Sequence, residues 1–448
     1  MRTRLAAIAV SLLVTTAIST PSFAGAGDDC CDDIEDLQRQ LLLLQSQIDE
    51  LKERSGTADH TVTWDPVPRI ARNDERFTWT PRGRLLIDFN NMDVSGEPVP
   101  GAPPRSSLDL QNTELRSARL GVEGTVFGST HYVFEVEFAD DPVLIGTNNA
   151  LNIMRAEQVG MRPELAGRLA GDRIVGHEDG AGIKVLDGGS GDIDVRITDA
   201  YLFWDLGRST RLKVGQFKEP VTMGQRTSLA HTDTIEKPQL ATTFGFGRRT
   251  GVAFEILRQK WLLSFGGYAE NINVQIPSGE EGYALATRAS WTPIRKDDRL
   301  LFLGASWMWR DYAADFPFAT YFVRPPSSDA LPFASLGVFP ADHDLFWGIE
   351  GAASWGPVSL QGEFGRMKPD LPGDINPDDP IFTSWYGQAG WFLTGENRSF
   401  SLRDGALSRT RVRRPVNEGG WGAGQLVARY EQTNLIDDPR FEGGDQTT

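Results

Sequence analysis

Basic side chains are concentrated in one segment of a chain that is otherwise acidic. The 448-residue sequence carries 45 Lys and Arg against 61 Asp and Glu, a formal net charge of −16. Between positions 208 and 249 the balance reverses, because eight basic residues face three acidic ones, 8 − 3 = +5. The basic residues are Arg208, Arg211, Lys213, Lys218, Arg226, Lys237, Arg248 and Arg249. Arginine can bind phosphate oxygens as a bidentate fork and lysine supplies a point charge, so the segment is suited to attract anions.

The basic segment is predicted to be a long loop between two strands. The run 211–217 alternates in character along its length and ends at Phe217. Lys218, Glu219 and Pro220 follow, and proline has no backbone N–H with which to continue a strand ladder. The chain enters a strand again at Arg249. A loop over 218–248 therefore carries most of the positive charge.

Period-two alternation marks most of the chain from position 82 onward. Tyr132, Phe134, Val136 and Phe138, for example, alternate with a second set of positions that includes two glutamates. This period is typical of β-strands. The predicted runs are 82–92, 117–126, 131–139, 194–206, 209–217, 249–257, 260–270, 283–292, 299–310, 345–354, 357–366, 383–394 and 421–433, about thirteen strands.

The connections between these runs favour a transmembrane barrel over a soluble β-sandwich. Short turns near 128–130, 207–209, 258–260, 293–298 and 355–357 alternate with long excursions at 93–112, 140–193, 218–248, 271–282, 311–344 and 367–382. Outer-membrane barrels have short periplasmic turns and long external loops. The connection 395–420 departs from this rule, because it is long but falls on the short-turn side. Its arginines are predicted to lie on the periplasmic surface: Arg398, Arg403, Arg409, Arg411, Arg413 and Arg414.

Charged side chains on the polar phases of the strands are candidates to line a lumen. A charged group facing lipid at the midplane costs about 2–4 kcal/mol, so the lumen is the cheaper placement. The candidates are Arg84, Arg119, Arg196, Arg211, Lys213 and Arg288. Alternatively, they only balance lumen carboxylates, namely Glu123, Glu135, Glu137 and Glu255.

The N-terminal segments predict export and association. Residues 1–24 combine Arg2 and Arg4 with an apolar run and Ser22-Phe23-Ala24, the pattern of a cleaved signal peptide. Residues 30–54 are predicted to form a coiled-coil helix, and 55–81 a linker. The heptad seam comprises Ile34, Leu37, Leu41, Leu44, Ile48 and Leu51. Cys30 and Cys31 either cross-link chains at the base of this helix or remain unpaired.

Several motifs resemble the phosphate-selective porin O and P family of outer-membrane channels. They are RLKVGQFKEP at 211–220, the TS and EK pairs that follow it, and GRRTGV at 247–252. LRSARLGVEGTVFGSTHYVFEVEFA at 115–139 and SWYGQAGWFLTGENRSF…GGWGAGQLVARY at 384–430 agree with the same family. The resemblance covers about 82–430, and its motifs identify the family without identifying the anion.

This resemblance implies a trimer of sixteen-stranded barrels whose loop after GQFKEP folds into the pore and narrows it. The candidates to line the constriction and bind anions are then Lys218, Arg226, Ser228, Lys237, Arg248 and Arg249. Leu229 stands where the family would have serine, and His231 adds a titratable group. Thirteen is an odd count and no aromatic ends the chain, so the barrel over 82–448 is expected to lack about three strands at a truncated C-terminus.

Other functional classes have little support in the residues. HExxH, GxSxG and Walker motifs are absent, so no enzymatic activity, cofactor or metal is predicted. The acidic composition argues against nucleic-acid binding. We therefore expect a Gram-negative outer-membrane porin in contact with lipid, which passes small anions such as phosphate or pyrophosphate. The alternatives are a general or cation-preferring porin and a non-conducting outer-membrane anchoring protein.

Overall fold

The chain comprises two compact units, Met1–His60 and Thr61–Thr448, which are described separately. The computed structural model describes residues 39–47, 60–64, 67–92, 110–139, 173–177, 180–186, 195–273, 281–312, 317–324, 334–372, 379–437 and 445–447. The predicted signal peptide and both cysteines lie outside the described residues.

In the first unit, residues 39–47 form a helix. This range lies within the predicted coiled-coil helix over 30–54, whose remaining residues lie outside the described part. Leu41 and Leu44, two positions of the predicted heptad seam, are 64% and 56% exposed. Association through this seam stays a prediction.

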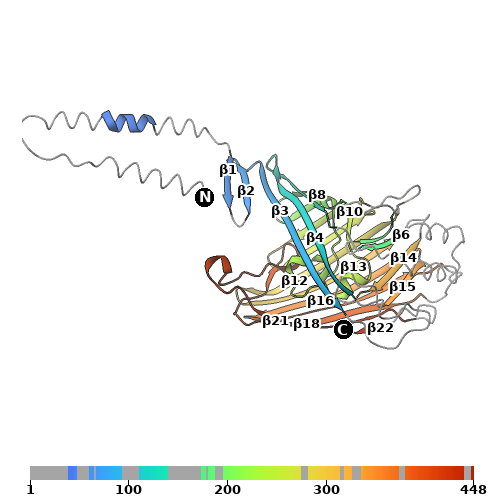
Figure 1. Ribbon diagram of the computed structural model, residues 1–448. Coiled ribbons are helices and arrows are strands. Elements are labelled where there is room, and N and C mark those ends of the chain that lie inside the picture. Colours follow the sequence, from blue (N-terminus) through green and yellow to red (C-terminus); the bar gives the residue numbers. More distant parts are fainter. Residues whose placement is uncertain are drawn as a thin grey trace, which may run out of the picture. The chain divides into compact units, whose positions relative to one another are not determined.

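The second unit is built on a sixteen-stranded antiparallel sheet. Figure 1 shows that the sheet curves, with β3 and β4 passing in front of the strands of the opposite side. Among the described residues, no pairing joins β1 to β22, so closure into a barrel stays a prediction. The strands in order of neighbours are β1 (His60–Trp64), β2 (Pro68–Arg72), β3 (Thr78–Met92), β4 (Leu110–Val126), β5 (Thr130–Glu137), β8 (Arg196–Asp205), β9 (Thr210–Lys218), β10 (Arg248–Leu257), β11 (Trp261–Tyr268), β12 (Tyr283–Lys296), β13 (Arg299–Asp311), β16 (His343–Trp355), β17 (Val358–Asp370), β18 (Phe382–Phe392), β21 (Gln425–Asn434) and β22 (Asp445–Thr447).

Each of the thirteen predicted runs overlaps one strand of this sheet, and three short strands were missed. These are β1, β2 and β22. The prediction of a linker over 55–81 was therefore wrong for 60–64, 68–72 and 78–81, which lie in β1, β2 and β3. The prolines and charges of this range masked two strands that are only five residues long.

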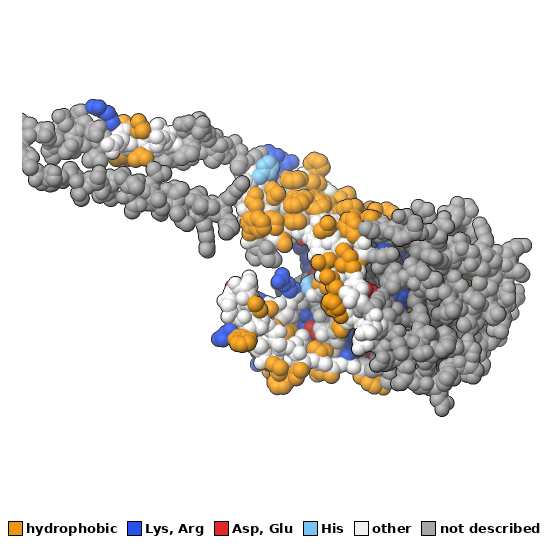
Figure 2. All heavy atoms as spheres, in the orientation of Figure 1, with side chains coloured by type: hydrophobic (Ala, Val, Ile, Leu, Met, Phe, Trp, Pro, Cys, Tyr) orange, Lys and Arg blue, Asp and Glu red, His pale blue; other side chains and the backbone are white. Residues whose placement is uncertain are grey.

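The strands place polar side chains inside and apolar side chains outside. Along β18, Ser384 and Gln388 are buried, whereas Trp385 and Trp391 are 37% and 51% exposed. Figure 2 shows hydrophobic side chains gathered over the outer surface of this unit, with charged side chains visible in a hollow between them. A soluble sheet has the opposite arrangement, so this pattern is typical of a wall that faces lipid. Within the described residues, no helix is long and apolar enough to cross a bilayer.

The loop between β9 and β10 folds against the inner face of the sheet, and its narrowing of a pore stays a prediction. It contains α5 (Met223–Arg226), a 3-10 turn η2 (Leu229–His231) and α6 (Gln239–Thr243). Gln239 on α6 donates its backbone N–H to Glu431 on β21, with an N–O distance of 2.8 Å. Glu236 accepts a bond from Arg116 on β4 at 2.9 Å. The loop is thus attached to strands far from β9 and β10 in the sheet order.

Aromatic side chains fill part of the interior beside this loop. Phe244 and Phe246 pack against Phe346 of β16, with ring centroids 6.2 and 4.6 Å apart. Tyr321 lies on a second inward hairpin, β14 (Phe318–Val323) and β15 (Ala334–Pro340), and contacts Phe244 edge-on. All four rings are almost completely buried. This apolar cluster joins the loop and the β14–β15 hairpin to the wall strand β16. A further hairpin, β6 (Arg173–His177) and β7 (Gly180–Leu186), forms a two-stranded sheet separate from the large sheet.

The arginines of the connection 395–420 were predicted to lie on the surface, but part of this connection packs inside the sheet. Within it, β19 (Ser399–Ser401) and β20 (Ala406–Ser408) form a hairpin that packs inside the sheet. Phe400 packs against Phe302 of β13 with the rings tilted and their centroids 4.6 Å apart, and Leu407 is buried in the same cluster. Arg398 is 6% exposed and forms an ion pair with Asp233 at 3.1 Å. Burial of these apolar side chains draws the hairpin inward, so the surface assignment of Arg398 was wrong. The 3-10 turn η3 (Val416–Glu418) follows.

Candidate functional site

A basic cavity of about 440 Å³ lies between the inner wall and the inward loop. Three acidic side chains line it, namely Glu135, Asp199 and Asp404. The basic side chains that line it are Arg82, Arg84, Arg119, Lys213, Lys218, Arg226, Lys237 and Arg248. The formal charge of the lining is therefore 8 − 3 = +5 with His231 neutral. The cavity is strongly cationic within a chain whose net charge is negative.

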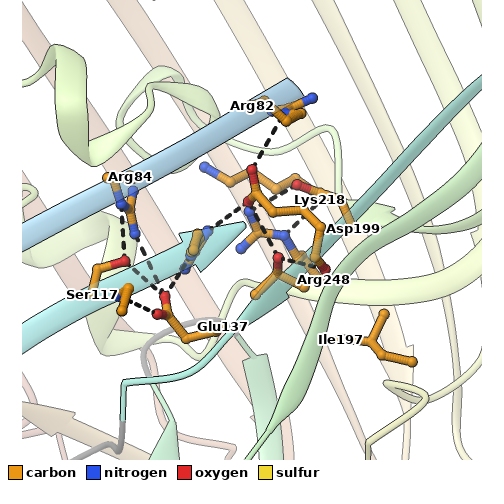
Figure 3. Close-up of polar contacts among 12 residues, drawn as sticks. Arg82, Arg84, Ser117, Glu137, Ile197, Asp199, Lys218 and Arg248 are labelled. Atoms are coloured by element: carbon orange, nitrogen blue, oxygen red, sulfur yellow. Dashed lines mark hydrogen bonds and ion pairs between the residues drawn. The ribbon is translucent and has the colours of Figure 1, made fainter. Parts of the chain in front are cut away.

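Strands β3, β4 and β5 form one wall of the cavity. Arg82 of β3 forms an ion pair with Glu135 of β5 at 3.2 Å, and Arg119 of β4 donates to the same carboxylate at 3.4 Å. Arg84 donates to the hydroxyl of Ser117 at 3.0 Å, and that hydroxyl donates to Glu137 at 2.8 Å (Figure 3). These side chains converge because they share the inward phase of their strands. Each guanidinium is thus held in place by a carboxylate or a hydroxyl.

Strands β8, β9 and β10 form the adjoining wall. Arg248 holds Asp199 through two parallel hydrogen bonds of 3.0 and 3.2 Å (Figure 3). Lys213 forms an ion pair with Glu255 at 3.0 Å. Buried charges of this kind need a partner, because an unpaired buried ion is costly. The acidic side chains therefore fix the cations and partly neutralise them, and the basic side chains remain in excess.

Helix α5 brings three of the predicted basic residues together. The ammonium groups of Lys218 and Lys237 both donate to the backbone carbonyl of Gln225, at 2.9 and 3.4 Å. Lys237 also donates to the side-chain oxygen of Gln225 at 3.0 Å. Arg226, the last residue of α5, donates to the carbonyl of Asp404 at 3.1 Å. Residues from the two ends of the loop and from the β19–β20 hairpin therefore meet at α5.

Ser228 and His231 complete the rim of the cavity on the loop side. Both side chains are partly exposed. Burial lowers the pKa of His231, and the positive charges of Arg398 and Arg409 lower it further. His231 is therefore neutral near pH 7 and becomes charged only in acid.

Eight of the twelve predicted site residues line the cavity. From the constriction set these are Lys218, Arg226, Ser228, Lys237 and Arg248, and from the lumen set Arg84, Arg119 and Lys213.

The other four predicted residues do not line the cavity, and three of them form ion pairs with carboxylates. Arg249 pairs with Glu219 and Glu270 at 3.1 and 3.0 Å, at the base of the loop. Arg196 donates to a backbone carbonyl at 3.2 Å. Arg211 bonds Asp205 at 3.1 Å near a short turn. Arg288 pairs with Glu350 at 2.6 Å beneath the inward hairpin. These four hold the structure together rather than face the cavity.

Three charged groups at the cavity were missed, namely Arg82, Asp199 and Asp404. Asp199 lies within the predicted run 194–206 but was not singled out. Arg82 has the same strand phase as Arg84, so the alternation contained the signal that would have identified it. Asp404 belongs to the inward hairpin, and nothing in the sequence pattern indicated that this connection turns inward. Within the described residues, no group of three His, Cys, Asp or Glu side chains is placed to hold a metal ion.

Comparisons with known proteins agree on a porin family. The family model described as phosphate-selective porin O and P matches residues 177–448. An uncharacterized protein of Caulobacter vibrioides is 26% identical over 397 residues, which cover 86% of this chain and 66% of that protein. Porin O of Pseudomonas aeruginosa is 33% identical over 98 residues, 21% of this chain and 20% of the porin. The chain thus spans slightly less than two thirds of the first relative and a fifth of the second.

Solved outer-membrane proteins are also similar at low identity. OpdL of Pseudomonas aeruginosa is 9% identical, with a TM-score of 0.28 and coverage of 84% of this chain and 89% of that one. The outer-membrane channel DcaP of Acinetobacter baumannii is 11% identical, with a TM-score of 0.30 and coverage of 81% and 99%. Because the family model matches more than half of the sequence, this chain belongs to the phosphate-selective porin O and P family of the outer membrane.

Proposed function

We propose that the protein is a channel that passes small anions, such as phosphate or pyrophosphate, passively through the basic cavity. The observation that carries this proposal is the +5 charge of the lining, set in a chain of net charge −16. Anions gain free energy on entering such a site, and repeated weak contacts let them leave again. Arginine and lysine side chains offer several donors to oxyanions.

The constriction is proposed to consist of the cavity-lining residues of the inward loop and the wall beside them. Arg226 and the two lysines held by Gln225 supply the loop's cations. Ser228 adds a hydroxyl donor, and Arg248 a guanidinium fixed by Asp199. Their position opposite Arg82 and Arg84 would surround an anion with donors on two sides.

A general or cation-preferring porin is the second candidate. It is favoured by the carboxylates that already pair with the cavity's cations, above all Glu135, Asp199 and Glu255. The sign of the reversal potential in a potassium chloride gradient separates the two, because it reports directly whether chloride or potassium carries the current. An outer-membrane protein that conducts nothing would form no channels in the same assay.

The setting of this channel is part of the proposal. We infer cleavage of a signal peptide over 1–24, closure of the curved sheet into a lipid-embedded barrel, and assembly as a homotrimer. The outward-facing apolar side chains, such as Leu85, Phe89 and Trp391, support contact with lipid or with a neighbouring barrel. Cross-linking of the purified protein in detergent tests the trimer.

A further inference from the structure

The buried carboxylate of Glu363 lies outside the cavity and contacts helix α5, whose other end holds basic residues of the inward loop. Glu363 of β17 is 5% exposed. Its two oxygens accept the backbone N–H groups of Met223 and Gly224, at 2.8 and 2.7 Å, in the first turn of α5. Tyr386 of β18 donates its hydroxyl to the same carboxylate at 2.8 Å. Met223, Gly224 and Gln225 are buried as well. The start of α5 is therefore held by a wall strand 140 positions away in the sequence.

The opposite end of α5 holds the basic groups. The carbonyl of Gln225 accepts from Lys218 and Lys237, and the carbonyl of Thr227 accepts from Lys218 at 3.5 Å. Arg226 extends from the same turn. Because α5 is a single turn of four residues, a shift of its first residues moves its last residues by a similar amount. A displacement at Glu363 is thus transmitted to three cations.

We propose that Glu363 is a positioning residue for anion selectivity, which acts by fixing α5 and, through it, Lys218, Arg226 and Lys237. This inference rests on the proposed anion-channel function, because it assigns a role to those three cations. Glu363 itself does not line the cavity.

The sign of the effect distinguishes positioning from simple electrostatics. Replacing Glu363 by Gln can only remove negative charge near a cationic cavity, so Coulomb's law alone would strengthen anion binding or leave it unchanged. Loss of position predicts the reverse. Glutamine keeps the size of the side chain, but its amide group would face a backbone N–H with another donor. At least one of the two bonds to α5 is then lost, and the cations spread apart.

The experiment measures block of chloride current by inorganic phosphate in planar bilayers, with the full chain and its E363Q variant. We expect phosphate to block E363Q about threefold more weakly than wild type. On a logarithmic scale this is about half of the effect expected when all three cations are replaced. In a K218Q/R226Q/K237Q background, E363Q should add nothing, because its targets are gone. The conservative E363D variant keeps both acceptor oxygens and should recover part of the block.

A matched control is available on the second loop helix. Glu431 of β21 accepts the N–H of Gln239 on α6 at 2.8 Å and is likewise 5% exposed. No residue of α6 lines the cavity. E431Q therefore removes a backbone contact to α6, together with an ion pair to Arg429 at 3.2 Å that lies outside the cavity. It should leave phosphate block within about 1.5-fold of wild type.

A second variant tests the contact from the loop side if E363Q does not insert. A Cβ atom at Gly224 would lie 3.0 Å from an oxygen of Glu363 and 3.3 Å from Cβ of Ala241. G224A should therefore push α5 away from the carboxylate and weaken block in the same direction. Block that is unchanged or stronger in both variants overturns the positioning role alone. A wild-type channel with no anion preference overturns the proposed function and this inference together.

Discussion

Removing the loop's cations should lower anion selectivity by an amount that follows from the size of the cavity. We consider K218Q/R226Q/K237Q, which reduces the charge of the lining from +5 to +2. Glutamine retains a donor at each position, so the bonds of the two lysines to the carbonyl of Gln225 can be replaced. The variant thus changes charge with little change of volume.

The expected magnitude is about tenfold. An ion at the centre of a sphere of 440 Å³ lies about 5 Å from the wall, where one unit charge in water contributes about 0.8 kcal/mol. Three charges contribute about 2.5 kcal/mol, and screening at about 0.1 M salt reduces this to about 1.5 kcal/mol. That free energy corresponds to about a tenfold change in anion occupancy.

The assay is the reversal potential of reconstituted channels in a potassium chloride gradient, which gives the ratio of chloride to potassium permeability. The control replaces Arg72, Lys260 and Lys368 by Gln, three exposed cations outside the cavity. We expect a tenfold lower ratio for the cavity variant and little change for the control. An unchanged ratio in the cavity variant, or an equal fall in both, refutes the assignment of selectivity to this loop.

Three other predictions test neighbouring parts of the structure. Lowering the pH from neutral into the acid range should raise chloride preference, because His231 has a lowered pKa and gains its charge only in acid; H231Q should show a smaller rise than wild type, and an equal rise would contradict this role of His231. Replacing the hairpin 399–408 by a short Gly-Ser turn should raise single-channel conductance, because this hairpin fills interior space and supplies part of the cavity lining; equal conductance would place the hairpin away from the ion path. Deleting residues 34–51 should weaken oligomers on mild gels and leave conductance intact, and lost conductance would show that the segment is needed for assembly.

The strands were predictable because the sheet separates polar and apolar side chains. Trp385 and Trp391 face outward, while Ser384 and Gln388 face inward. This separation appears in the sequence as the period-two alternation. The short strands escaped notice, since five residues such as 60–64 give too few alternations to stand out. The number of strands in the sheet therefore did not follow from the pattern.

The candidate site was predictable where it depends on strand phase or on the family motif. Of the residues that the inward phase predicted to line a lumen, Arg84, Arg119 and Lys213 lie at the cavity. The same reasoning failed for Arg288, because the β19–β20 hairpin covers it; its guanidinium donates to the carbonyl of Gly405 at 2.5 Å. Whether a long connection turns inward depends on packing such as that of Phe400 on Phe302, which no local pattern encodes.

Contacts between segments that are distant in the sequence could not be predicted either, because no local pattern encodes them. Glu363 occupies an inward-facing position in the strand alternation, as many other residues do. Nothing in the neighbouring sequence indicates that its carboxylate accepts two N–H groups from α5. Likewise, Arg398 lies among six arginines of one connection, and only the folded chain shows that it pairs with Asp233. Long-range partners of this kind appear only when the loop is packed against the wall.

The most direct test of the anion-channel proposal is the reversal potential of the wild-type protein in a potassium chloride gradient, followed by titration of phosphate. We predict a potential of the sign set by chloride and a chloride current that falls as phosphate is added. A potential of the sign set by potassium would contradict the proposal and support a cation-preferring porin. Failure to form any channel would contradict both.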